Sequence, residues 1–133
     1  MRVPRAARRA VVVILLVGVS AGCGGESRGS VAERAPVDAS VADFCAAYFA
    51  VQDVESGQDV RDWVDRFAEV GTPPGVAAEA RAGFEVLVEV AAASDAEADV
   101  ADLADPDVSA AEQADLEAFS AYVATTCAEH LAP

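Results

Sequence analysis

This chain of 133 residues is long enough for one small domain, and its 23 acidic residues against nine basic ones give it a formal net charge of −14 at pH 7. Such an excess of negative charge repels nucleic-acid phosphates and anionic lipid headgroups. The composition therefore disfavours nucleic-acid binding and flat adhesion to a lipid surface.

The first 22 residues predict a signal peptide that is cleaved from the mature protein. Four arginines precede an apolar run that begins at Ala10 and ends at Val19, and small residues follow it up to Gly22. A basic head, a short apolar segment and a small-residue end are the parts of an export signal. The apolar run has about ten residues, whereas a helix needs roughly 20 to span a bilayer.

The sequence Ser20-Ala21-Gly22-Cys23 resembles the lipobox of bacterial lipoproteins. Ala21, Gly22 and Cys23 fit that pattern, and Ser20 stands where a leucine-like residue is usual. The resemblance implies that Cys23 is lipidated, becomes the first mature residue and anchors the protein at the outer face of the cell membrane. The alternative is an ordinary secretory signal, which would leave the protein secreted.

Residues 23–39 are predicted to be the lipidated cysteine and a flexible tether. They carry glycine, serine, proline and mixed charge, with no sustained apolar period. Segments of this composition behave as flexible chains. The folded domain is therefore expected to occupy residues 40–133.

Residues 40–133 predict an all-α domain, a small four-helix bundle. Apolar side chains recur at spacings of three and four residues, which is typical of helices that bury one face. Gly83 lies within the third of these helices and either weakens it or lets another helix approach closely. The helices are expected over residues 41–56, 59–70, 74–92 and 110–131.

Polar residues mark where three of these helices begin. Ser40 with Asp43, and Ser109 with Glu112, have the spacing of N-terminal capping boxes. Thr72 precedes two prolines and is expected to cap the third helix.

Two cysteines, Cys45 and Cys127, fall on the predicted apolar faces of the first and last helices. If Cys23 carries lipid, these two remain as an even pair in an oxidising compartment, where pairing is the rule. A Cys45–Cys127 disulfide would close a loop of about 80 residues and stabilise the fold by about 4.5 kcal/mol in the loop-closure treatment. The alternative is two reduced cysteines that pack as small hydrophobic side chains.

Residues 94–108 form the most acidic stretch and are expected to lie across one end of the bundle. Asp95, Glu97 and Asp99 alternate as the first ligands of a calcium loop do, but Val100 replaces the required glycine and Pro106 the bidentate glutamate. We interpret this stretch as a solvated acidic segment, and we expect no metal site.

The sequence shows no set of residues typical of an enzyme active site. Its one histidine, His130, lies three residues from the C-terminus, where chain ends fray. It has no Cys-x-x-Cys motif and no histidine pair of the kind that binds zinc or haem. We expect no cofactor and no enzymatic activity.

Three aromatic residues, Trp63, Phe67 and Phe84, are speculative ligand-binding residues. Their helical spacing favours core packing. A cavity of roughly 300 Å³ or more lined by all three would instead indicate a carrier of small apolar ligands, whereas a solid core would exclude it.

In general character the chain resembles the small, uncharacterised two-cysteine helical lipoproteins of high-G+C Gram-positive bacteria. This resemblance rests on the alanine and arginine usage, the lipobox and the placement of the cysteines, and it names no activity. Our leading hypothesis is a membrane-anchored, non-catalytic lipoprotein that binds or scaffolds a partner outside the cell. Opposite charge favours a basic envelope protein or a cationic ligand as that partner.

Overall fold

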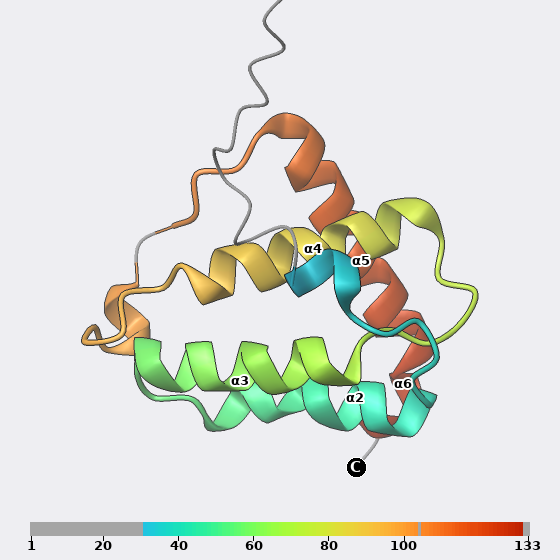
Figure 1. Ribbon diagram of the computed structural model, residues 1–133, viewed down its shortest axis with the longest axis horizontal. Helices are drawn as coiled ribbons and strands as arrows, with labels where there is room; N and C mark the ends of the chain where they lie inside the picture. Colours follow the sequence, from blue (N-terminus) through green and yellow to red (C-terminus); the bar gives the residue numbers. More distant parts are fainter. Residues whose placement is uncertain (1–30, 104, 132–133) are drawn as a thin grey trace, which may run out of the picture.

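The computed structural model describes residues 31–103 and 105–131, and all regular structure within these ranges is helical (Figure 1). The all-α class is therefore confirmed, whereas the signal segment and Cys23 lie outside the described residues. A helical turn covers residues 31–34. The longer elements are α2 (Val41–Phe49), the 3₁₀ helix η1 (Ala50–Asp53), α3 (Gly57–Val70), α4 (Ala78–Ala92), the 3₁₀ helix η2 (Val100–Asp102), α5 (Ala110–Thr126) and α6 (Ala128–Leu131).

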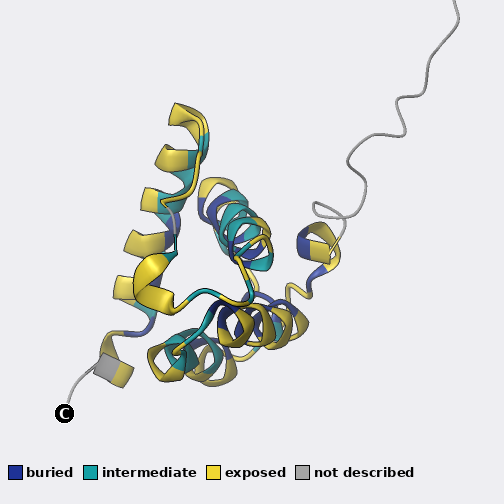
Figure 2. Cartoon of the chain, turned by 90° about the vertical axis from the view of Figure 1, so that its left-hand side faces the viewer, coloured by how far each residue is buried: buried dark blue, intermediate teal, exposed yellow. Residues whose placement is uncertain are grey.

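Three helices lie alongside one another, and α5 crosses them. Figure 1 shows α2, α3 and α4 running across the view, with α5 descending steeply past α4. Figure 2 looks nearly along the first three helices and shows α5 upright beside them, with the buried faces turned inward. Within the described residues, no helix combines the length and apolar character needed to cross a bilayer.

Gly83 lies where α4 meets α5. A Cβ atom at this position would collide with the carbonyl oxygen of Asp115 and would lie 2.7 Å from the Cβ of Phe119. Because glycine has no Cβ, the two helices approach closely here. The second of the two alternatives for this glycine is therefore confirmed.

The core is built around the ring of Phe67, which is fully buried. Five other aromatic rings lie with their centroids between 5.1 and 6.5 Å from it. Aromatic pairs at this separation add to the free energy gained from burial. The five rings come from all four long helices and belong to Phe44, Tyr48, Trp63, Phe84 and Phe119.

Ser40 and Ser109 both cap the helices that they were predicted to start, and Ser109 with Glu112 forms the full capping box. At Ser40 the carboxylate of Asp43 accepts from the serine hydroxyl and not from the backbone N–H.

A further capping box, which the sequence reading missed, joins Ser56 to Asp59 and starts α3 at Gly57. The first helix therefore ends earlier than predicted. It becomes a 3₁₀ helix after Phe49, because Ser56 already belongs to the start of the next helix.

The third helix begins at Ala78 and not at residue 74. Pro74 and Gly75 form a turn, in which Gly75 has a φ of 80°. Thr72 lies too far ahead of this start to cap the helix, and its hydroxyl oxygen instead accepts a hydrogen bond from the side chain of Arg81. The N-cap is Ala77, which has no side-chain oxygen to offer.

The last predicted helix is divided in two. Cys127, with φ −100° and ψ 15°, ends α5 and is followed by the short helix α6. The side chain of Cys127 is bonded to α2, so the chain turns at the point where it is anchored to the neighbouring helix.

Residues 31–39, placed in the flexible tether by the sequence reading, pack against the domain. Ala32 and Ala35 are 1% and 7% exposed. The N–H of Thr72 donates to the carbonyl of Pro36 at 2.9 Å, and the N–H of Ala39 donates to the carbonyl of Thr72 at 3.2 Å. These backbone bonds hold the segment on the loop before α4, so the folded unit includes residues ahead of residue 40. The remainder of the predicted tether, residues 23–30, lies outside the described residues.

Candidate functional site

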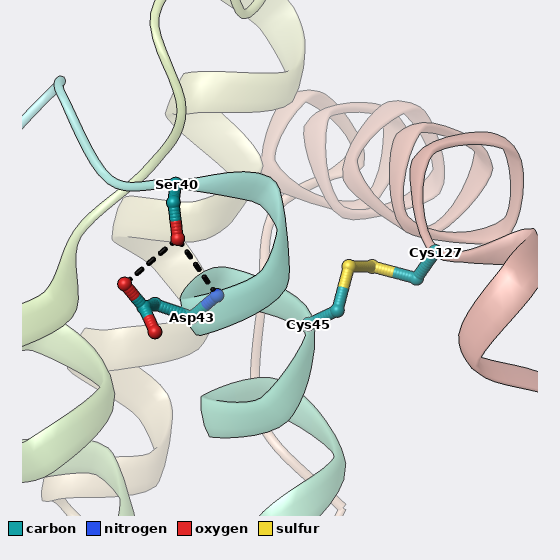
Figure 3. The surroundings of a disulfide bond; sticks show 4 residues. All are labelled: Ser40, Asp43, Cys45 and Cys127. Carbon is teal, nitrogen blue, oxygen red and sulfur yellow. Dashed lines mark hydrogen bonds between the residues drawn. A yellow bond between two sulfur atoms is a disulfide. The ribbon is translucent and has the colours of Figure 1, made fainter.

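The predicted disulfide between Cys45 and Cys127 is confirmed. Cys45 lies in α2, Cys127 caps α5, and their Cα atoms are 5.7 Å apart (Figure 3). Both residues are fully buried. One turn before Cys45, the hydroxyl of Ser40 accepts from the N–H of Asp43 and donates to its carboxylate, which fixes the start of the same helix.

Arg81, in α4, connects that helix to residues 31–39, the N-terminal segment. The sequence analysis did not single out this arginine. Its guanidinium donates to the carbonyl oxygens of Ala32, Ala35 and Pro36 at 2.8 to 3.3 Å. It also donates to the hydroxyl of Thr72 and forms the ion pair with Glu85, while its central carbon lies 4.9 Å from the ring centroid of Phe84. The available signal was the scarcity of cations, because arginine is the only strongly basic residue type in the chain.

The acidic segment is held in place by the start of α3. The N–H groups of Gly57 and Gln58 donate to the carbonyls of Ala98 and Ala96 at 2.8 and 3.1 Å, and the N–H of Val100 donates to the carbonyl of Glu55. The first N–H groups of a helix have no partner within the helix, so they are available for such bonds. A Cβ at position 57 would collide with the carbonyl of Asp95, so this close approach requires glycine.

A groove of about 530 Å³ lies between α4, the acidic segment and the first turn of α5. Five of the residues along it are large and apolar: Val86, Val90, Leu103, Pro106 and Val108. Six others carry carboxylates: Glu89, Asp95, Asp102, Asp105, Asp107 and Glu112. The remaining three are alanine or serine, so the charge presented by the lining side chains is entirely negative.

A second, smaller hollow of about 280 Å³ adjoins this groove on the side of α2 and α3. Its lining is mostly apolar and includes Tyr48, Val51, Trp63 and Leu87. The indole N–H of Trp63 donates to the carbonyl of Ala47 at 2.8 Å, which fixes the orientation of its ring.

The three speculative ligand-binding residues do not share a cavity. Trp63 lines the smaller hollow, whereas Phe67 and Phe84 are fully buried and pack edge to face within the core. A hydrophobic core packs at crystal-like density and leaves little space beside such rings. Of the three residues, only Trp63 lines the hollow, and Phe67 and Phe84 belong to the core beside it.

Two carboxylates act as helix caps. Hydrogen bonds to the side chain of Ser56 and to the backbone N–H groups of Ser56 and Glu55 lower the pKa of Asp59. The backbone and side chain of Ser109 likewise lower the pKa of Glu112. In both cases the hydrogen bonds favour the charged carboxylate.

The last positions considered in the sequence analysis are His130 and the acidic residues of the calcium-like pattern. His130 is exposed in α6. In residues 31–103 and 105–131, no group of three or more histidine, cysteine or acidic side chains is arranged to hold a metal ion. Asp95, one of the residues of the calcium-like pattern, accepts a hydrogen bond from the N–H of Glu97 and so stabilises a turn.

Comparisons with protein-family models, with curated proteins and with solved structures give no match to this chain.

Proposed function

We propose that this chain is a membrane-anchored extracytoplasmic lipoprotein whose helical domain is a non-catalytic binding module. The observation that carries the binding role is the groove beside α4, a preformed concave surface lined by five large apolar residues and six carboxylates. Binding sites are commonly concave and mostly apolar, with a few polar groups that select the ligand.

The export and the anchor are part of the same proposal. The basic and apolar start of the chain and the lipobox-like Ser20-Ala21-Gly22-Cys23 support it. The buried Cys45–Cys127 disulfide supports an oxidising compartment, where such bonds form and persist. In this proposal, residues 1–22 are removed as a signal peptide and the four long helices fold as one bundle.

Charge identifies the kind of partner that such a module would bind. The acid-lined groove favours a basic envelope protein or a cationic ligand, because complementary charges speed encounter and exclude wrong partners. The non-catalytic role is supported by the position of the single histidine, which is exposed near the end of the chain.

The anchor is tested by mass spectrometry of the mature protein isolated from cell envelopes. The expected mass shows cleavage before Cys23, added acyl chains and two hydrogens fewer for the Cys45–Cys127 bond. The Cys23→Ala variant should lose the acyl mass and leave the membrane fraction. Intact chain in the cytoplasm with three free thiols would contradict the proposal.

The binding role is tested by a pull-down from detergent-solubilised envelope with the full mature chain as bait. We expect a partner that is retained by the native chain and lost when salt is raised. Recovery of no partner, together with an envelope unchanged by deletion of the protein, would count against the binding role.

A small apolar-ligand carrier is the second candidate. The observation that favours it is the apolar hollow lined by Trp63 and Leu87, whose volume of about 280 Å³ lies close to the lower limit of ordinary ligand pockets. A neutral apolar compound that binds there as tightly as its charged analogue would favour this candidate over a charge-selective module.

A further inference from the structure

The groove and the smaller hollow are neighbours that share lining residues. Val90, Ser94 and Leu103 contribute to both. Beyond these three, the groove has six acidic side chains among apolar ones, whereas the hollow has only aromatic and aliphatic side chains. The lining therefore changes from apolar to strongly acidic across the boundary that Val90, Ser94 and Leu103 form between the two sites.

We propose that these two neighbouring sites hold one small amphiphilic cation. Its apolar chain or ring lies in the hollow against Trp63 and Leu87, and its amine or ammonium group lies among the carboxylates of the groove. This inference rests on the proposed role as a binding module and names the class of ligand.

The cationic end follows from the charge of the groove. Glu89 on α4 lies along the same groove as Asp102, Asp105 and Asp107 from the acidic segment. Like charges gathered in one concave surface repel one another, and a bound cation removes part of that repulsion. Backbone hydrogen bonds between α3 and the acidic segment fix the segment that bears Asp95 and Asp102, so a ligand does not have to order it.

The apolar end follows from the lining of the hollow. Tyr48, Val51, Trp63 and Leu87 come from α2, η1, α3 and α4, so four elements form its walls. Burying apolar surface there supplies binding free energy, while a polar head alone would leave this surface exposed to water. Together the two volumes, about 530 and 280 Å³, suit a small molecule.

The experiment uses the only tryptophan of the chain, Trp63, as its reporter. Tryptophan fluorescence of the full mature chain is titrated with n-octylammonium, and separately with 1-octanol and octanoate, which share its alkyl chain. We expect n-octylammonium to shift the emission and to bind at least about tenfold more tightly than octanoate, a difference of about 1.4 kcal/mol. Added salt should weaken the binding of n-octylammonium and leave the binding of 1-octanol unchanged.

Two sets of variants locate the site. Removing three negative charges from the groove should weaken the binding of n-octylammonium about 5- to 10-fold and leave the binding of 1-octanol unchanged. The groove variant combines Glu89→Gln, Asp105→Asn and Asp107→Asn. A control with the same change in net charge uses exposed acids that line neither site: Asp53→Asn, Asp65→Asn and Glu69→Gln.

A filling variant tests the apolar end independently. Val90→Phe places a larger side chain where both sites meet and should reduce the binding of n-octylammonium and of 1-octanol alike. Circular dichroism and the thermal midpoint of each variant show whether the fold is retained.

The outcomes separate this inference from the proposed function. Equal binding of the three octyl compounds, or equal weakening by the groove and control variants, would overturn the inference. Absence of any response to n-octylammonium, while the envelope pull-down still recovers a partner, would also overturn it and leave the binding module in place. Failure of both experiments would overturn both.

Discussion

The two ends of this domain are held by different sets of interactions. At the right-hand end in Figure 1, a disulfide joins α2 to α5, and the side chain of Arg81, together with backbone hydrogen bonds to Thr72, holds residues 31–39 beside α4. At the left-hand end, backbone hydrogen bonds between the start of α3 and residues 96–100 hold the acidic segment.

The difference bears on where a binding surface can form. Backbone hydrogen bonds do not depend on which side chains the segment carries, so the left-hand end can present many carboxylates without losing its position. The groove accordingly lies beside the acidic segment.

The largest effect is expected from removal of the disulfide. The double variant Cys45→Ala with Cys127→Ala should lower the free energy of unfolding by about 4.5 kcal/mol, because the unfolded chain regains the entropy of an 82-residue separation. Denaturant unfolding of the native chain and the variant measures the difference. A loss below about 1 kcal/mol would mean that packing alone holds this end.

The second-largest loss of stability is expected from a substitution at Arg81. Arg81→Met should cost about 2–3 kcal/mol, because it leaves the buried hydroxyl of Thr72 and the carbonyl of Ala35 without their donor and removes one of the two donors to the carbonyl of Ala32. Arg81→Lys should recover only part of this loss, since an ammonium lacks the planar fork.

Hydrogen exchange tests the same variant at the level of the segment. In Arg81→Met, the amides of Ala35 and Ala39, which donate to the carbonyls of Ala32 and Thr72, should exchange faster than in the native chain. Arg66→Met, at an exposed position of α3, is the control. Unchanged exchange at the amides of Ala35 and Ala39 would show that Arg81 does not hold the segment.

A smaller effect is expected at the opposite end, at Gly57. Gly57→Ala introduces a Cβ that collides with the carbonyl of Asp95, so the acidic segment must move away from α3. We expect a loss of about 1–2 kcal/mol and faster exchange at the amides of Gly57 and Gln58. Gln58→Ala is the control, because it keeps both backbone bonds. Slower unfolding of Gly57→Ala would contradict the close approach.

The smallest effect is expected at the helix caps and depends on pH. Because the folded pKa of Glu112 is lowered, the charged carboxylate stabilises the fold at neutral pH, and this contribution is lost as pH falls through the folded pKa. Glu112→Gln should therefore lower the thermal midpoint at neutral pH. The difference from the native chain should vanish in acid, below the ordinary carboxyl range near about 4.

The same measurement at Asp59 provides a second case. The pKa of Asp59 is shifted in the same direction as that of Glu112. The thermal midpoint of Asp59→Asn should therefore also approach that of the native chain as pH falls. A difference that grows in acid for either variant would contradict the assigned hydrogen bonds. Comparing each variant with the native chain removes the general effect of neutralising the other carboxylates.

Sequence alone determined the features that depend on near neighbours along the chain. The spacing of apolar residues predicted helices, and Ser40 and Ser109 marked two of their starts, because a cap is made within a few residues. The disulfide was also predictable, since Cys45 and Cys127 lie on apolar faces that must turn inward.

Only the tertiary structure decided the features that join residues far apart in sequence. Arg81 binds carbonyls more than 40 residues earlier, Gly57 meets the acidic segment, and Trp63 lines a hollow while Phe67 fills the core. No local pattern encodes such contacts, because they depend on how whole helices cross. The start of α4 at Ala78 also lacks a local signal, because its N-cap residue, Ala77, has no side-chain acceptor.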